Sequence, residues 1–377
     1  MMRRDDRKRA VFCLLFFLVL CGFWIVDLLS KDRIYSEWEK RMLAQKPEMN
    51  TAGILDGSYG TAYEKWLTDQ FPGRDQWVGW KTRCEILLGK KEIREIYLGK
   101  DGYLFAQSEE TADWDALETQ MQKLFGADAV SRIHAPHAGS VLTEQVPSPL
   151  SFPGRQDAVW KNLSDHRDEY IYFRTDHHWT MLGAYYAYEA WAKEQGLAPL
   201  PLVHMEKRIL RKDFYGTHYG KIHYAKEPDQ MEFYDPGTEC EAVYDLGESD
   251  VTGLYQEQHL KGEDAYRFFL DGNHPVVQIK TEQQGGHLAV LKDSFANNLI
   301  PFLTAHYERI TVIDPRYFRV DMGQWLQEQD VTEVLILAQD TTEAEYADGS
   351  CEVRECFSVR GEEYGGRRNK CQAFKSC

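Results

Sequence analysis

Three side chains in this chain of 377 residues have the types that nucleophilic acyl chemistry requires. Asp176 and His178 lie two positions apart, so on an extended backbone they project to the same side. The carboxylate can then accept a hydrogen bond from one imidazole nitrogen, which leaves the other nitrogen free to act as a base. Ser294 follows an apolar segment, where its hydroxyl can be exposed. A nucleophilic serine needs such a base and a group that orients the base, so we predict a Ser-His-Asp triad.

The residues beside the predicted triad are candidates for binding an oxyanion or a substrate. Backbone amides near the serine and asparagine side chains after it can donate hydrogen bonds to a developing oxyanion. The residues on either side of His178 complete the set. Besides the amide of Ser294 itself, the candidates are Phe295, Asn297, Asn298, His177 and Trp179.

Other interpretations of the same residues stay open at this point. Asp176, His177 and His178 together could ligate a metal, although no H-E-x-x-H or C-x2-C motif offers further ligands. A serine after a strand is also a common turn residue, and a buried histidine often has only a structural role. We expect no metal and no cofactor, but the pattern alone does not decide between catalysis and structure.

The elements that must position these residues are strands and helices in alternation. Residues 286–291, 310–314 and 331–337 are apolar runs typical of buried strands. Helices are predicted between them, from Pro301 onward and over 322–329. Strand–helix–strand–helix–strand at these spacings predicts a parallel sheet covered by helices. Ligands bind beyond the carboxyl ends of such strands, which is where Ser294 would lie.

The histidine motif is predicted to follow a strand of its own. Residues 169–173 (EYIYF) are typical of a strand, and the motif at 175–179 would end it. A helix is then expected over 180–195, because Gly196 stands where a C-terminal glycine belongs. Residues 200–275 are polar and aromatic with many turn signals, and they indicate an insertion of short strands and loops.

The segment before the motif contains weaker signals. Helical periodicity is plausible over 59–68, 76–88 and 111–125, and Asp101-Gly102 between apolar runs predicts a hairpin. Residues 126–160 contain four prolines and no clear run of strand-forming residues.

Residues 172–180 (YFRTDHHWT) are similar to the signature of the bacterial DHHW family. The family itself resembles the SGNH-like domains of alginate O-acetylation proteins. Further matches in the expected order are DQFPGRD at 69–75, YLGKDGYL at 97–104 and KDSFAN at 292–297. The resemblance implies that Asp176 and His178 supply acid and base and that Ser294 is the nucleophile.

The resemblance also implies a fold and a function. The fold would be α/β and SGNH-like (flavodoxin-like), a parallel sheet with helices on both faces. The activity would be O-acetyl transfer to a cell-surface or exported polysaccharide, with a membrane-bound O-acyltransferase as the partner that donates acetyl groups. Two alternatives stay open: a polysaccharide acetyl esterase that uses the same triad, and a non-catalytic glycan-binding or scaffold protein of the cell envelope.

Two segments depart from the family pattern. Residues 126–160 look shortened, as if one core strand before the motif were lost. Residues 346–377 extend beyond the point where the family chain usually finishes, and they contain four cysteines. A local change of reading frame would account for both departures. We therefore predict that the tail is disordered.

The N-terminus has the pattern of a membrane anchor. Residues 3–9 contain five basic side chains, and residues 11–30 form an apolar run long enough to span a bilayer. The basic cluster precedes the run, which predicts a cytoplasmic segment over 1–10 and an extracytoplasmic domain over 31–345. The net charge of the chain is −16, which argues against a nucleic-acid partner.

Overall fold

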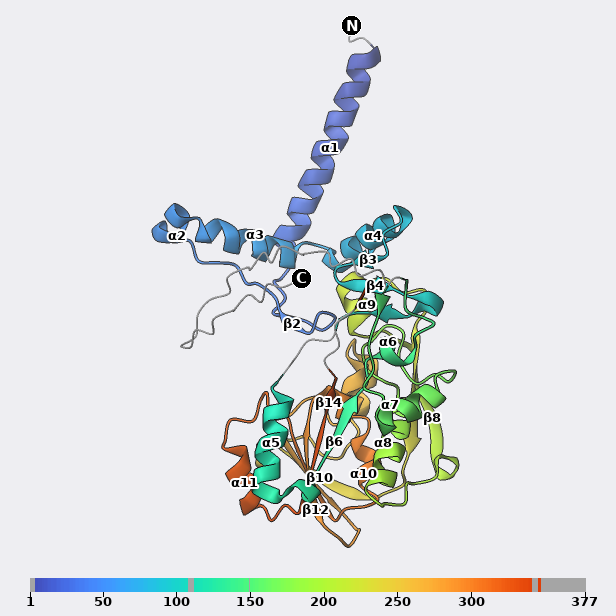
Figure 1. The fold of residues 1–377 in the computed structure, drawn as a ribbon. Helices are drawn as coiled ribbons and strands as arrows, with labels where there is room; N and C mark the ends of the chain where they lie inside the picture. Colours follow the sequence, from blue (N-terminus) through green and yellow to red (C-terminus); the bar gives the residue numbers. More distant parts are fainter. Residues whose placement is uncertain (1–3, 108–111, 149, 341–344, 347–377) are drawn as a thin grey trace, which may run out of the picture.

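The computed structural model describes residues 4–107, 112–148, 150–340 and 345–346. Its centre is a sheet of six strands in the order β10–β11–β13–β12–β14–β6 (Figure 1). The strands are β6 (Val130–Ala135), β10 (Cys240–Tyr244), β11 (Val276–Thr281), β12 (His287–Lys292), β13 (Arg309–Ile313) and β14 (Glu333–Gln339). The three strands predicted from apolar runs correspond to β12, β13 and β14, each within two residues of the expected ends.

The sheet is mixed, which corrects the prediction of a parallel sheet. β13, β12, β14 and β6 run parallel, whereas β11 pairs antiparallel with both β10 and β13. β10 comes from the region predicted as an insertion, so part of that region extends the main sheet. Its burial alternates because it is an edge strand with one solvent-facing side, and this weakens the apolar signal.

The core strand expected to be missing is present. β6 lies in the proline-containing segment 126–160 and pairs with β14 from Val130 to Ala135. It is an edge strand, and only two of its six side chains are buried. Arg132 projects to α5 and forms ion pairs with Asp115 and Glu118. A strand with polar contacts on one side lacks the apolar pattern of a buried strand, so the predicted loss of a core strand was wrong.

Helices cover both faces of the sheet (Figure 1). One face packs against α5 (Trp114–Phe125) and α11 (Met322–Glu328), where Trp114, Met121 and Leu326 share a core with side chains of β12 and β14. The larger core lies on the other face, against α7 (Ala158–Asp165), α8 (Met181–Glu194) and α10 (Ile300–Leu303). Thr180 caps α8, since its hydroxyl accepts a hydrogen bond from the amide of Gly183, and the helix agrees with the one predicted over 180–195.

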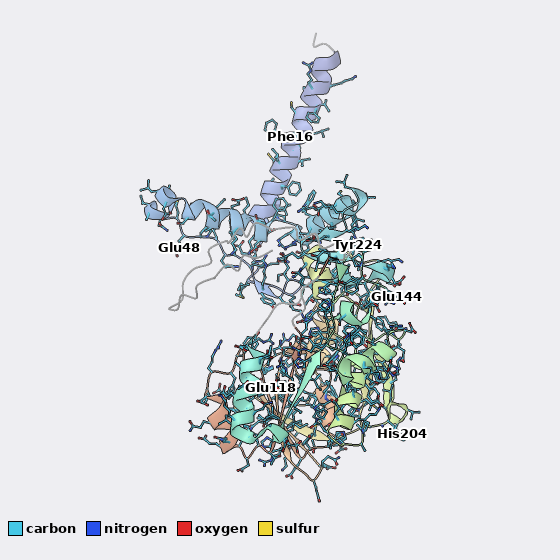
Figure 2. The ribbon with its side chains drawn as sticks, viewed as in Figure 1. Phe16, Glu48, Glu118, Glu144, His204 and Tyr224 are labelled. Carbon is cyan, nitrogen blue, oxygen red and sulfur yellow. The ribbon has the colours of Figure 1, made fainter. Side chains whose placement is uncertain are left out.

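The N-terminal third forms separate helices and short strands. α1 (Arg4–Leu29) extends away from the rest of the molecule, and α2 (Thr51–Asp56), α3 (Ser58–Gln70) and α4 (Arg74–Leu87) lie at its base (Figure 1). Phe16 projects from α1 into open space in Figure 2. Among the residues that the structure describes, no helix reaches the length and hydropathy of a membrane span.

Several short elements complete the fold. β4 and β5 are joined through Asp101 and Gly102, both with positive φ, which confirms the predicted hairpin. The tail from 347 onward lies outside the described residues. The remaining short elements are β1 (Tyr35–Ser36), β2 (Arg41–Met42), β3 (Glu92–Ile93), β4 (Ile96–Leu98), β5 (Leu104–Phe105), α6 (Ala138–Val141), β7 (Leu150–Ser151), β8 (Glu206–Phe214), α9 (Thr217–Ile222), β9 (Asp229–Asp235) and β15 (Glu345–Tyr346).

Candidate active site

The three predicted triad residues form one hydrogen-bonded chain, although 116 positions separate His178 from Ser294. Nε2 of His178 lies 2.8 Å from Oγ of Ser294. Nδ1 of His178 lies 2.5 Å from Oδ1 of Asp176. The ionised carboxylate can only accept, so Nδ1 carries the proton and Nε2 is left to accept the serine proton. This is the tautomer that a general base needs.

Asp176 is held by hydrogen bonds on both carboxylate oxygens. Oδ2 accepts the backbone amide of Thr217 at 2.7 Å and its hydroxyl at 3.0 Å, while Oδ1 also accepts the amide of His178 at 3.0 Å. Burial opposes ionisation of Asp176, but the neighbouring His178 and His177 and the hydrogen bond from His178 outweigh it. They hold the pKa of the Asp176 carboxyl well below its usual range. The carboxylate is therefore charged at any pH near neutrality.

The backbone before the motif is not the strand that was predicted over 169–173. Only a single bridge between Tyr172 and Trp179 remains there. The buried carboxylate of Asp229, at the start of β9, accepts the backbone amides of Arg174 and Thr175 at 2.8 Å each. Those amides bind a side chain and no neighbouring strand, so the segment forms a tight loop that is held from a distant part of the chain.

Ser294 begins a short 3₁₀ turn directly after β12, as predicted from its place in the chain. The amide of Ser294 has no acceptor among the described residues. The amide of Phe295 donates to Oδ1 of Asp293 at 2.9 Å, and Oδ2 of Asp293 accepts the amide of Gln339 at 2.7 Å. Ser294 therefore keeps a free backbone donor, whereas Phe295, also predicted as an oxyanion donor, has used its amide to build the turn.

Two other predicted substrate-binding residues are structural. Asn298 is fully buried and exchanges hydrogen bonds with Trp179. Nε1 of the indole donates to Oδ1 of Asn298 at 2.8 Å, and Nδ2 of Asn298 donates to the carbonyl of Trp179 at 3.2 Å. This pair joins the histidine loop to the serine turn. Sequence reasoning could not distinguish this bracing role from substrate binding, because both need a polar group beside the nucleophile.

Asn297 lines the cavity beside Ser294, but its amide group is also engaged. Its Nδ2 donates to the carbonyl of Gly272 at 3.1 Å, and its Oδ1 accepts from Nζ of Lys292 at 2.8 Å. The same lysine donates to Oδ1 of Asn273 at 2.7 Å. Asn273 was not among the predicted residues. Its Oδ1 is held by Lys292, and its Nδ2 has no acceptor among the described residues.

Ser294, His178 and Asn273 open onto one cavity of about 530 Å³. Its walls come mainly from the segment around β1, the histidine motif, the region 258–274 and the serine turn, with Thr217 and Tyr317 completing them. Tyr266 covers the triad: its ring stacks on His178 with centroids 4.1 Å apart, and its hydroxyl donates to the carbonyl of Ser294 at 3.2 Å. Tyr266 was missed because its segment carries no motif.

The metal alternative has some geometric basis. One ligand atom each from Asp176, His177 and His178 could lie within 4.8 Å of the others. Nδ1 of His177, however, lies 2.7 Å from Oγ1 of Thr217, and both nitrogens of His178 belong to the triad. A metal there would have to displace the Asp176–His178 or His178–Ser294 hydrogen bond. The donor set therefore fits a triad better than a metal centre.

Comparison with known proteins supports the resemblance noted in the sequence. The family model described as DHHW protein matches residues 155–313, a range that contains Asp176, His178 and Ser294. The DHHW resemblance is confirmed. No curated protein matches the chain.

The chain is also similar in fold to solved structures. A DHHW family protein from Eubacterium siraeum is 24% identical, with a TM-score of 0.54 over 66% of this chain and 91% of that one. PatB1 of Bacillus cereus is 17% identical, with a TM-score of 0.50 over 63% and 94%. At these identities the likeness establishes a shared α/β fold and leaves the chemistry to the site itself.

Proposed function

We propose that this protein is an extracytoplasmic serine acyl-ester enzyme, an O-acetyltransferase whose acceptor is a hydroxyl group of a cell-surface or exported polysaccharide. The observation that carries the proposal is the continuous chain from Asp176 through His178 to Oγ of Ser294, with the tautomer of His178 fixed by the carboxylate. The DHHW match and the resemblance to acetylation proteins favour an acetyl ester as the substrate.

In the first half-reaction, Oγ of Ser294 attacks the carbonyl carbon of the acetyl donor. The serine proton passes to Nε2 of His178, and Asp176 stabilises the resulting imidazolium. The carbonyl oxygen becomes an oxyanion, for which the amide of Ser294 and Nδ2 of Asn273 are available donors. When the carbonyl reforms, the leaving oxygen takes the proton from His178 and an acetyl-serine remains.

In the second half-reaction, His178 removes a proton from an incoming hydroxyl, and that oxygen attacks the acetyl-serine. Collapse of the intermediate transfers acetyl to the acceptor and returns the proton from His178 to Ser294. Attack by a sugar hydroxyl gives transfer, whereas attack by water gives hydrolysis. The esterase alternative therefore uses the same residues. The cavity of about 530 Å³ has room for a sugar ring next to the serine, which both reactions require.

The proposal includes membrane anchoring through residues 11–30, with a membrane-bound O-acyltransferase as acetyl donor. The support is the continuous helix α1, whose apolar side chains include Phe12, Leu14 and Phe17, exposed by 71%, 60% and 62%. Side chains of this kind are stable in contact with lipid and unfavourable in water. The five basic residues before them favour a cytoplasmic N-terminus.

The test uses the full chain, purified in detergent, with a chromogenic acetyl ester as donor and a mixture of oligosaccharides as acceptors. Ser294→Ala should lower turnover by at least about 10³-fold, because alanine has no hydroxyl group to form the acyl-enzyme. Ser58→Ala, an exposed serine of α3, is the matched control and should keep full activity. A serine-reactive sulfonyl fluoride should add its mass to the wild type and not to Ser294→Ala.

The outcomes separate the three candidate functions. Acetylated oligosaccharide in the product identifies a transferase, and acetate alone identifies an esterase. If wild type and Ser294→Ala have equal activity and neither reacts with the sulfonyl fluoride, the serine mechanism is wrong. If neither protein turns over the ester at all, a non-catalytic envelope protein is the better description.

A further inference from the structure

The outward face of α4 is apolar. Trp77, Trp80, Leu87 and Leu88 have exposed fractions of 51%, 65%, 86% and 83%. Their spacing of three, seven and one residues places them on one stripe of the helix, with the exposed Cys84 between them. A surface helix of a soluble domain normally directs such an apolar stripe toward the core. In α4 the stripe faces outward instead.

The opposite face of α4 is already fixed against the domain, so the helix cannot simply rotate to bury the stripe. Thr82 is buried and donates its hydroxyl hydrogen to the carbonyl of Ile222 at 2.7 Å. Gly79 packs so closely that an added Cβ would lie 2.9 Å from the carbonyl oxygen of His223. The apolar stripe is therefore a fixed feature that no other described part of the chain covers.

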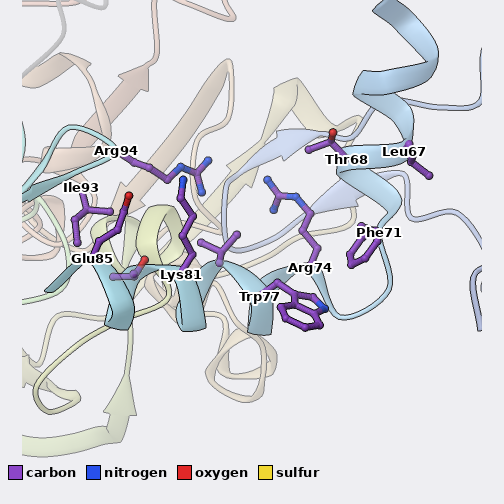
Figure 3. Close-up of a pocket in the computed structure, with 11 residues that line it drawn as sticks. Leu67, Thr68, Phe71, Arg74, Trp77, Lys81, Glu85, Ile93 and Arg94 are labelled. Atoms are coloured by element: carbon purple, nitrogen blue, oxygen red, sulfur yellow. The ribbon is translucent and has the colours of Figure 1, made fainter. Parts of the chain in front are cut away.

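A groove of about 470 Å³ lies beside this stripe, between α3, α4 and β3 (Figure 3). Phe71 and Trp77 lie at one end of it and Ile93 at the other. The side chains of Lys81 and Arg94 extend toward each other above α4 in Figure 3. An apolar floor with cationic side chains above it suits a molecule that has an apolar part and an anionic head.

The charge of this region is opposite to that of the whole protein. Residues 74–94 contain six basic and three acidic side chains, a balance of +3 in a chain whose net charge is −16. Glu85, on the wall of the groove, is paired with Lys90 at 2.8 Å. Lys81 forms no ion pair with any described residue. The surplus of positive charge thus coincides with the exposed apolar stripe.

The groove is also continuous with α1. The ring of Phe23 stacks on Phe71 with centroids 5.7 Å apart and lies 6.0 Å from the ring of Trp77. Figure 1 shows α2, α3 and α4 spread to either side of the lower end of α1, between it and the six-stranded sheet. A bilayer around α1 would end at about the level of these helices.

From these observations we infer that α4 and the adjacent groove form a second contact with the bilayer that holds α1, seated at the level of anionic phospholipid headgroups. Tryptophan side chains favour this depth, because one part of the indole is apolar and its N–H group is polar. Lysines near the surface attract anionic lipids. The inference rests on the proposed anchoring by α1. It adds that the catalytic domain is held at a fixed orientation and does not swing on a free tether.

The experiment uses the full chain in nanodiscs whose lipids carry bromine on the acyl chains, which quenches nearby tryptophan fluorescence. Quenching should be clear in the wild type, and Trp77→Phe/Trp80→Phe should lose more than half of it. Trp325→Phe is the matched control, because Trp325 lies on α11 at the other end of the domain (Figure 1). The remaining tryptophans are common to all these proteins and cancel in the comparison.

A second arm tests the charge. Nanodiscs of phosphatidylcholine with about one third phosphatidylglycerol should quench Trp77 and Trp80 more than phosphatidylcholine alone. Lys81→Glu/Lys91→Glu should abolish that increment, whereas Lys212→Glu on the distant β8 should keep it. Free inorganic phosphate should not compete, because the groove recognises a headgroup in a bilayer.

The outcomes distinguish this inference from the proposals on which it depends. If the chain leaves the lipid fraction on flotation, the anchoring by α1 fails, and this inference fails with it. If the chain floats but wild type and Trp77→Phe/Trp80→Phe are quenched equally, the anchoring stands and the inference is wrong, because α4 then faces water or a protein partner. Ser294→Ala should keep full quenching, which separates lipid contact from catalysis.

Discussion

Lys292 is a fully buried lysine whose charge is expected to support the active site. Its Nζ donates to the amide oxygens of Asn273 and Asn297 and lies 3.9 Å from Oδ2 of Asp314. Burial is the largest influence and lowers the pKa of Lys292 to about 8, although Asp314 and Asp293 favour its charge. Arg316, which is paired with Asp314, acts in the same direction as burial.

We predict that the wild-type enzyme loses activity as pH rises through about 8 without unfolding. A neutral amine makes weaker hydrogen bonds than an ammonium, so Asn273 would be held less firmly. Stability should change in the opposite direction. The unfolded chain binds the proton up to its ordinary pKa of 10.5 and the folded chain only to about 8, so stability rises with pH across that window.

The measurement is kcat against pH, with thermal unfolding followed over the same range. Lys292→Arg keeps its charge and should shift the alkaline loss of kcat to higher pH. Lys292→Met should have a low kcat with no such loss and should be more stable than the wild type below pH 8. If kcat falls with rising pH in the same way in all three proteins, Lys292 does not cause the alkaline loss of activity.

At the residue scale, the sequence predicted what depends on near neighbours. Asp176 and His178 are two positions apart, and their pairing could be inferred from that spacing alone. Ser294 was placed by the apolar strand before it. The oxyanion donors were less predictable, because availability depends on distant partners. The amide of Phe295 donates to Asp293, and Lys292 holds the side chain of Asn273 by a hydrogen bond to its oxygen. Neither contact has a sequence signature.

At the scale of elements, the close approach of two loops positions the acid of the triad. Gly216 lies so near Asp176 that an added Cβ would be 2.2 Å from both Cβ and Oδ2 of that residue. The backbone of Gly216 has a φ of −101°, which any residue can adopt, so the requirement for glycine is steric. The next residue, Thr217, donates its amide to the same carboxylate.

We predict that Gly216→Ala lowers kcat by about 100-fold, because a methyl group there must displace Asp176 and with it the imidazole, and a misplacement of about 1 Å has an effect of that size. The measurement is steady-state kinetics with a small acetyl ester. Gly60→Ala in α3 is the control, since no atom lies within 4 Å of its added Cβ. Unchanged kcat in Gly216→Ala would show that Asp176 does not need its present position.

The same scale explains which elements could be predicted. β12, β13 and β14 are buried on both faces, so each is an uninterrupted apolar run. β6 and β10 are edge strands with alternating or polar faces, and they were missed for that reason. Residues 169–173 have strand-forming side chains, yet Asp229 binds the amides that follow them and a loop results. The loop that follows these residues is held by one buried carboxylate, 55 positions away from Arg174.

At the scale of the whole molecule, the catalytic cavity is completed by the segment that follows α1. The turn between β1 and β2 contributes Lys40, whose Nζ lies 3.0 Å from Oδ1 of Asp264 in the region that carries Tyr266. The segment after α1 and the inserted region thus meet across the cavity. Neither contribution was predicted, because the segments are separated by more than 200 positions and share no motif.

We predict that this ion pair governs acceptor binding more than chemistry. Lys40→Ala or Asp264→Ala should raise KM for an oligosaccharide acceptor several-fold and leave kcat for a small acetyl ester nearly unchanged, because both residues line the cavity without touching Ser294. A partly exposed pair of this kind contributes roughly 0.2–1 kcal/mol. The double variant should therefore raise KM no more than the more affected single variant does. A double-mutant cycle measures this coupling.

The control is Arg33→Ala, which breaks the pair with Asp75 at 3.2 Å in the same N-terminal segment but away from the cavity. It should leave both kinetic parameters as they are. If Arg33→Ala raises KM as much as Lys40→Ala does, the effect belongs to the general packing of the segment and not to the cavity wall. Additive losses in the double variant would likewise mean that Lys40 and Asp264 act independently, and that the two segments do not close the acceptor site together.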